Sequence, residues 1–227
     1  MEFLNSADFW IGLMKIVWIN IILSGDNAVV IALAARSLPP AQQKKAIMFG
    51  SGAAVVLRIV LTVVAAKLLE LSFLQVVGGC LLLWIGYQLL SGGEEGEGDS
   101  QGTSTMFAAI RTILIADLVM SLDNVIAVAA TAQGNMVLLI LGLAISIPLV
   151  IFGSTLMIKL MERFPIIITV GAALIGWVGG ETIVNDKLLH DYTMAHPWLH
   201  YAAAAAGAIL VVALGKWMQS RQTTTSA

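Results

Sequence analysis

Two short stretches of the chain, 24–30 and 121–127, are near copies of one another, and each places an aspartate and an asparagine inside a long apolar run. The pairs are Asp26 with Asn27 and Asp123 with Asn124. An ionised aspartate at the centre of a bilayer costs at least about 2.5 to 3.5 kcal/mol, so aspartates inside a membrane usually have a function. We therefore interpret the two stretches as the halves of a cation site.

Two further polar residues extend the halves of this candidate site. Asn20 precedes Asp26 by the same interval as Asp117 precedes Asp123. The predicted metal ligands are Asp26, Asp117, Asp123, Asn27, Asn124 and Asn20. Carboxylate and amide oxygens are hard ligands that suit Mg²⁺, Ca²⁺ or Mn²⁺, and no histidine or cysteine is available at this depth for zinc or copper. The alternative for the asparagines and the neighbouring serines is hydrogen bonding between helices.

Two charged residues outside these stretches are candidates for a gate or a counter-ion. Arg58 lies near the middle of an apolar run, and we expect it to be a counter-ion because a guanidinium has no lone pair to offer a metal. Glu181 lies toward the end of a later apolar run, where a gate carboxylate and an interfacial residue are equally good readings. Aspartates and histidines at 186–200 form a metal-compatible group, although such loop residues are more often simply solvated.

The composition is that of a membrane protein. Of 227 residues, 59% are hydrophobic and only 11% are charged, against about 25% charged residues in soluble domains. Apolar segments long enough to cross a hydrocarbon core of ~30 Å recur along nearly the whole length, which predicts one membrane domain, 1–227. The net charge of −2 and the lack of a basic run argue against nucleic-acid binding.

Hydropathy and helix breakers predict an all-α, polytopic membrane protein with seven transmembrane helices. The expected spans are 9–34, 46–68, 72–90, 108–131, 136–158, 166–184 and 200–218. An acidic, glycine-rich linker, 91–107, separates the third span from the fourth. Lys and Arg gather on one side when the amino terminus is placed outside, so we expect the amino terminus out, with the carboxyl terminus and the linker in the cytoplasm.

The chain also contains an internal repeat. The interval from Asp26 to Asp123 equals that from Asn20 to Asp117, and residues 77–88 match residues 170–181. Three spans per repeat is an odd number, so we expect two inverted three-helix repeats, 9–90 and 108–184, followed by a seventh helix, 200–218. Gly25 favours a helix break in the first copy, whereas Leu122 does not favour one in the second.

The two motifs, SGDNAV at 24–29 and SLDNV at 121–125, together with residues 146–154 and 176–181, resemble the TerC family of integral membrane proteins. The likeness covers essentially the whole chain and is greatest for the short bacterial members. It implies kinship with the lysine-exporter superfamily and a role in manganese efflux, pH-linked manganese homeostasis or tellurium resistance. Carried over residue by residue, the implied site is Asp26, Asn27, Asp117, Asp123 and Asn124.

We therefore expect a multi-pass protein of the bacterial inner membrane that exports a divalent cation, Mn²⁺ ahead of Ca²⁺, by alternating access. The alternatives are an amino-acid exporter and a non-transporting scaffold in a metal or tellurite stress response. We expect no enzymatic activity, since no span holds a nucleophile with an adjacent base or an HExxH pair, and no cofactor. The expected partners are the metal ion and the lipid bilayer, with a homo-oligomer left open.

Overall fold

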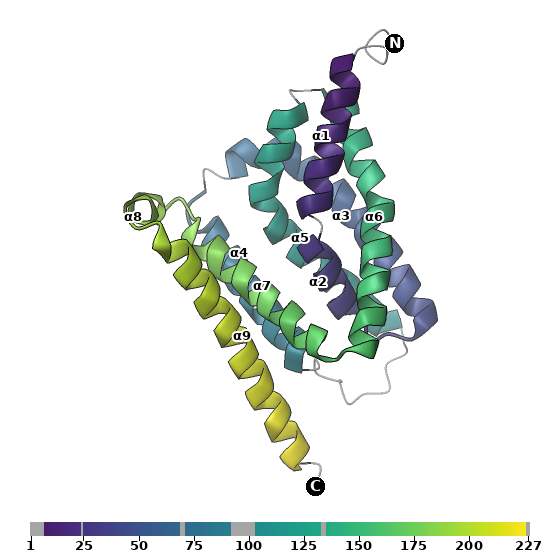
Figure 1. Ribbon diagram of the computed structural model, residues 1–227, viewed down its shortest axis with the longest axis vertical. Coiled ribbons are helices and arrows are strands. Elements are labelled where there is room, and N and C mark those ends of the chain that lie inside the picture. Colours follow the sequence, from purple (N-terminus) through teal and green to yellow (C-terminus); the bar gives the residue numbers. More distant parts are fainter. Residues whose placement is uncertain (1–6, 24, 69–70, 92–102, 133–134, 226–227) are drawn as a thin grey trace.

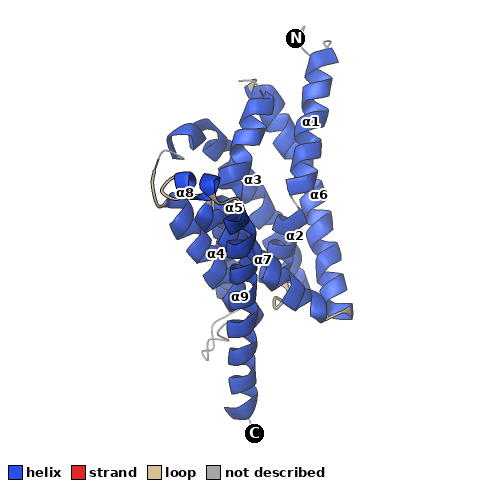
Figure 2. Ribbon diagram, turned by 60° about the vertical axis from the view of Figure 1, so that its left-hand side comes forward, coloured by secondary structure: helices blue, strands red, loops and turns tan. Residues whose placement is uncertain are grey.

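The computed structural model describes residues 7–23, 25–68, 71–91, 103–132 and 135–225, without the side chains of some helical residues, Asp123 among them. Throughout these ranges the secondary structure is helical, with no strand (Figures 1 and 2). The helices are α1 (Ala7–Leu23), α2 (Gly25–Ala35), α3 (Pro40–Leu68), α4 (Leu74–Ser91), α5 (Thr103–Ala132), α6 (Met136–Arg163), α7 (Ile166–Val184), α8 (His190–Ala195) and α9 (Trp198–Thr225).

Five of the described helices are long and apolar enough to cross a membrane, or six if the bent pair α1 and α2 counts as one span. The five are α3, α4, α6, α7 and α9. Helix α5 has 30 residues but is not among them, and it carries Arg111, Asp117 and Asp123. The all-helical membrane fold is thus confirmed, and the count of seven spans stays a prediction.

Two helices begin earlier than hydropathy suggests. Helix α3 begins at Pro40, six residues before the predicted span 46–68, because proline at the first helical position needs no hydrogen-bond acceptor and has a helical φ. Helix α5 begins at Thr103, inside the predicted linker 91–107. Hydropathy marks only the apolar part of a helix, so polar first turns escape it.

The first span is broken where the sequence predicts it. Helix α1 ends at Leu23 and α2 begins at Gly25, and the two helices are bent by 47°. In the second copy of the motif, α5 runs through Leu122 and Asp123 without interruption. The predicted difference between the two copies is therefore confirmed. The bend aims the first turn of α2, which carries Asp26 and Asn27, at the middle of the bundle.

Helices at corresponding places in the two halves make corresponding contacts. Helix α3 packs along α5, while α6 packs along α1 and α2, and α4 packs on α7. A glycine of α3, Gly50, faces Ile113 of α5, and a glycine of α6, Gly142, faces Ile16 of α1. The interval from Ile16 to Ile113 is the same as that from Asn20 to Asp117. These contacts agree with the internal repeat that the sequence predicts, and the repeat itself stays a prediction.

Helices α4, α7 and α9 form a tightly packed group through glycines. A Cβ added to Gly79 of α4 would lie 2.5 Å from the carbonyl oxygen of Gly179 of α7, and one added to Gly176 would lie 2.5 Å from that of Gly207 of α9. Glycine lets helix backbones approach this closely, which is the main way that membrane helices associate. Figure 1 shows α9 continuing past the other helices to the carboxyl terminus.

The amino-terminal end of α4 is capped by Asp186, which comes from the loop after α7. The Asp186 carboxylate is 1% exposed and accepts hydrogen bonds from the backbone N–H groups of Phe73, Gln75, Val76 and Leu188 at 3.0 to 3.3 Å. A carboxylate at this position satisfies the free N–H groups of a first helical turn and interacts favourably with the helix dipole. Asp186 therefore ties the loop after α7 to the start of α4.

Candidate functional site

The centre of the candidate site is a buried ion pair between α3 and α5. An Arg58 guanidinium nitrogen lies 2.6 Å from Oδ1 of Asp117, and the two side chains are 6% and 7% exposed. Arg58 Nε donates to the hydroxyl of Ser121 at 3.1 Å, and that hydroxyl donates to Oδ2 of Asp117 at 3.3 Å. Ser121 lies one turn after Asp117 on α5, so the two side chains share a helix face. Arg58 is thus the counter-ion that the sequence predicts.

A small cavity of about 20 Å³ borders this ion pair. About 10–15 Å³ of such volume is enough for one water molecule, so the cavity has room for one particle of that size. Its polar lining brings together four helices, with Asn27 of α2, Ser51 and Arg58 of α3, Asp117 of α5 and Ser146 of α6. All five of these residues are buried. The oxygen-bearing side chains of both halves therefore meet at one central point.

Asp26 lies at the edge of this group. It is partly buried in the first turn of α2, where its Oδ1 accepts a hydrogen bond from the backbone N–H of Asn27 at 2.9 Å. Its carboxylate interacts electrostatically with both Arg58 and Asp117. A helix amino terminus stabilises a neighbouring negative charge, so the break before Gly25 supplies the backbone groups that hold Asp26.

Asn20, at the end of α1, is fully buried, and neither polar atom of its amide group has a hydrogen-bond partner among the described residues. Within the same part of the chain the Ser51 hydroxyl, which lines the cavity, is also buried without a partner. Leaving a buried polar group unsatisfied costs about 1–3 kcal/mol, so native proteins rarely do so. These two groups are therefore ready to bind a polar particle within the bundle.

Three predicted site residues remain: Asp123, Asn124 and Glu181. The side chain of Asp123 lies outside the described part of the structure, while Asn124, the next residue of α5, is partly buried. Glu181 does not line the central cavity but an exposed pocket between α7 and α9. The structure therefore gathers Asp26, Asn27, Arg58 and Asp117 and separates Glu181 from them.

Sequence reasoning missed the two serines that line the cavity, Ser51 and Ser146. Each lies in a helix rich in small residues, where serine usually serves packing. Ser51 and Ser146 can be recognised only because α3 and α6 contact α5 and α2, and these contacts are visible only in the folded structure.

The metal-compatible residues at 186–200 do not come together as a set of three ligands in the structure. Asp186 is committed to the backbone N–H groups of α4, and this loop, which is described throughout, contains no group of three His, Cys, Asp or Glu side chains that could hold a metal. Burial alone would raise the pKa of Asp186, but the hydrogen bonds from Leu188, Phe73, Val76 and Gln75 together lower the pKa below its usual value.

Comparison of the sequence with known proteins shows which family the chain belongs to. A family model described as "Integral membrane protein TerC family" matches residues 5–223. The chain belongs to the TerC family. The chain is 47% identical to the uncharacterized membrane protein YjbE of Bacillus subtilis (strain 168) over 189 residues. This aligned region covers 83% of the present chain and 86% of YjbE.

More distant relatives are 25% identical. The inner membrane protein YoaE of Escherichia coli (strain K12) matches over 209 residues, 84% of this chain and 40% of YoaE. The uncharacterized membrane protein YceF of Bacillus subtilis matches over 237 residues, 100% of this chain and 91% of YceF. No solved structure matches the chain. The resemblance of the sequence to the TerC family is therefore confirmed. An inner-membrane location agrees with the description of YoaE as an inner membrane protein.

Proposed function

We propose that this TerC family protein exports a divalent metal cation, with Mn²⁺ as the favoured ion, through the site at the Arg58–Asp117 pair. The observation that carries the proposal is the buried ion pair beside a cavity that is lined by oxygen donors from both halves of the chain. Carboxylate, amide and hydroxyl oxygens suit hard cations such as Mn²⁺ and Ca²⁺. The preference for Mn²⁺ rests on the function that the family resemblance implies.

Arg58 gives this site a way to bind and release its ion. Both carboxylate oxygens of Asp117 are engaged, one by Arg58 and the other by Ser121. A cation that binds Asp117 therefore competes with the guanidinium, and Arg58 returns to Asp117 when the cation leaves. Because an uncompensated buried charge is costly, this exchange lets the empty protein change conformation without carrying an unpaired Asp117.

The charges of the site fit a divalent ion. Arg58 and Asp117 neutralise each other, and the other two aspartates of the predicted ligand set, Asp26 and Asp123, carry two negative charges. One divalent cation balances them. Proton exchange is compatible with the same carboxylates, because each can bind a proton after the metal has left.

Alternating access requires two halves that rock against each other around a fixed site. The packing supports inverted repeats, since α3 on α5 is matched by α6 on α1 and α2. The start of α1 and the end of α9 lie at opposite ends of the structure (Figure 1). We place the end where α1 begins outside the cell and the end where α9 finishes inside. In this arrangement α1 and α2 together form one membrane span, and α5 forms another.

Cellular metal content tests the proposal. Cells that lack the protein should accumulate Mn²⁺, and the wild-type gene should restore the normal content. Asp26→Asn and Asp123→Asn should fail to do so at equal protein levels. Glu162→Gln is the matched control, because Glu162 is an exposed carboxylate near the end of α6. Normal rescue by both aspartate variants would contradict the central site, and an unchanged Mn²⁺ content in cells that lack the protein would contradict export of this ion.

A further inference from the structure

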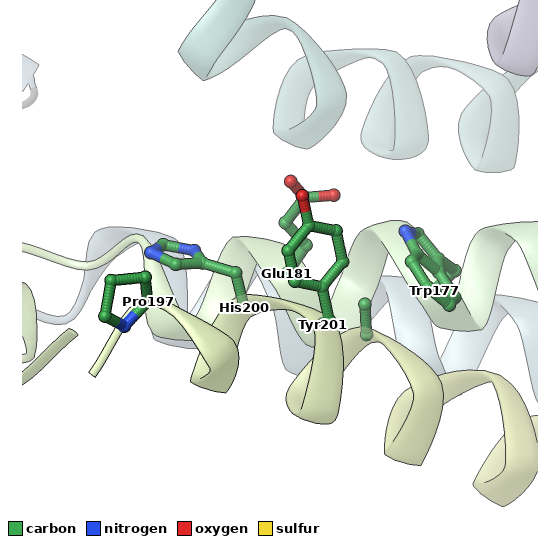
Figure 3. A pocket seen from close by; sticks show the side chains of 6 residues that line it. Trp177, Glu181, Pro197, His200 and Tyr201 are labelled. Atoms are coloured by element: carbon green, nitrogen blue, oxygen red, sulfur yellow. The ribbon is translucent and has the colours of Figure 1, made fainter. Parts of the chain in front are cut away.

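A second pocket lies between α7 and α9, apart from the central cavity. It has a volume of about 310 Å³ and is lined by Trp177, Glu181, Pro197, His200, Tyr201 and Ala204. Figure 3 shows Glu181 between His200 and Trp177, with Tyr201 in front of it. This volume is at the lower end of the range for small-molecule sites, and it is far larger than one metal ion requires.

The two walls of this pocket are held at a fixed spacing. Trp177 and Glu181 lie one turn apart on α7, and His200, Tyr201 and Ala204 lie on the first turns of α9. Between them, Gly180 of α7 lies against the backbone of Ala203 of α9 so closely that a Cβ on Gly180 would clash. A pocket whose walls are in direct backbone contact is preformed, which reduces the entropy cost of binding.

Glu181 has no protein partner in this pocket. Among the described residues the Glu181 side chain takes part in no hydrogen bond or ion pair, although it lies in the apolar segment Ile166–Val184. No lysine or arginine lines the pocket. Glu181 is exposed in an otherwise apolar helix, and among the described residues that line the pocket none is a cation that would compensate its charge.

The lining matches one class of cation. The Glu181 carboxylate and the Tyr201 hydroxyl offer acceptors, and a primary ammonium has three donors and no acceptor. The ring faces of Trp177 and Tyr201 attract a cation. A metal is disfavoured here, because only two of the residues that line this pocket, Glu181 and His200, are of the His, Cys, Asp or Glu type. We propose that this pocket binds a primary ammonium group, from a free amine or from an aminophospholipid headgroup.

The experiment uses the full chain in nanodiscs of phosphatidylglycerol alone, with ethanolamine as the probe and saturation-transfer NMR as the readout. Ethanolamine should bind saturably, and Glu181→Gln should weaken its binding at least about tenfold. Trp177→Leu should weaken it several-fold, and Glu162→Gln should leave it unchanged. Tetramethylammonium should bind more weakly than ethanolamine, since it has no N–H to donate.

A second arm of the experiment distinguishes a free amine from an aminophospholipid headgroup as the source of the ammonium group. In nanodiscs that contain phosphatidylethanolamine, loss of the ethanolamine signal identifies the lipid headgroup as the occupant, and an unchanged signal identifies a free amine. The inference is overturned if the wild type shows no saturable binding, if Glu181→Gln binds as well as the wild type, or if Mn²⁺ displaces ethanolamine. None of these outcomes depends on Mn²⁺ export, so this inference and the proposed function fail separately.

Discussion

Arg58 on α3 and Asp117 on α5 form an ion pair of 2.6 Å inside the helix bundle, and neither side chain is more than 7% exposed. This pair joins the two halves of the chain, because α3 lies in the first predicted repeat and α5 in the second. It also connects structure with proposed function, since the same Asp117 carboxylate lines the central cavity. Any cation bound there has to take the place of a protein cation.

Removing Arg58 should destabilise the protein more than removing both charges. In Arg58→Gln the buried Asp117 loses its counter-ion, and breaking a buried pair typically costs about 3–5 kcal/mol. Arg58→Gln combined with Asp117→Asn should recover part of this loss. Thermal unfolding of the purified single and double variants measures the difference. If the double variant were as unstable as the sum of the two single variants, the two charges would not be coupled.

Asn20 should matter for transport and not for stability. Its buried amide has no partner, so Asn20→Leu, which has a similar size, removes an unsatisfied group and should leave the unfolding temperature equal or higher. The same change should reduce Mn²⁺ export, because it removes a predicted ligand. A comparison of unfolding temperature and cellular Mn²⁺ content checks both. Lower stability together with normal export would assign Asn20 to packing.

The cap at α4 should make stability depend on pH. The hydrogen-bonded Asp186 carboxylate has a pKa below its usual value of 3.8, so its contribution is fully present above that pH and disappears as the pH falls through the lowered value. Asp186→Asn should therefore unfold at a lower temperature than the wild type at pH 7, and this difference should shrink below about pH 4. Asp191→Asn, five residues later in α8 and exposed, is the control. A difference that stayed constant with pH would argue against the charged cap.

Replacing a glycine by alanine should destabilise the protein more where the glycine packs against another helix than where it has no neighbour. In Gly176→Ala the new Cβ would lie 2.5 Å from the Gly207 carbonyl oxygen, and overpacking of this kind costs about 1–3 kcal/mol. Gly52 has nothing within 4 Å of the added Cβ, so Gly52→Ala should be neutral or stabilising by about 0.5–1 kcal/mol. Unfolding temperatures of the two variants decide the matter. Equal effects would contradict the close packing of α7 on α9.

The sequence was sufficient for the membrane class, the broken first span and the role of Arg58 as a counter-ion. These depend on local features: apolar runs, Gly25 between polar residues, and a guanidinium that needs an anion. The sequence could not decide which aspartate pairs with Arg58, because Asp26 and Asp117 are both near the middle of their spans. Only the packing of α3 along α5 selects Asp117.

Long-range contacts also explain what the sequence interpretation got wrong. Asp186 lies among loop residues that looked solvated or metal-binding, and its role becomes visible only when α4, more than a hundred residues earlier, supplies the N–H groups. Ser51 and Ser146 are similar cases, since their helices meet only in the fold. Glu181, for which a gate and an interfacial position were equally expected, lies in a pocket formed with α9, which leaves both possibilities as predictions.

The central claim is tested most directly by Mn²⁺ flux into proteoliposomes that contain the purified protein. The wild type and Glu162→Gln should carry Mn²⁺ down an imposed gradient at equal rates. Asp117→Asn, which alters the carboxylate at the central cavity, should carry it at least about tenfold more slowly. Flux in Asp117→Asn equal to that of the wild type, or no flux in the wild type above that of empty liposomes, would contradict the account.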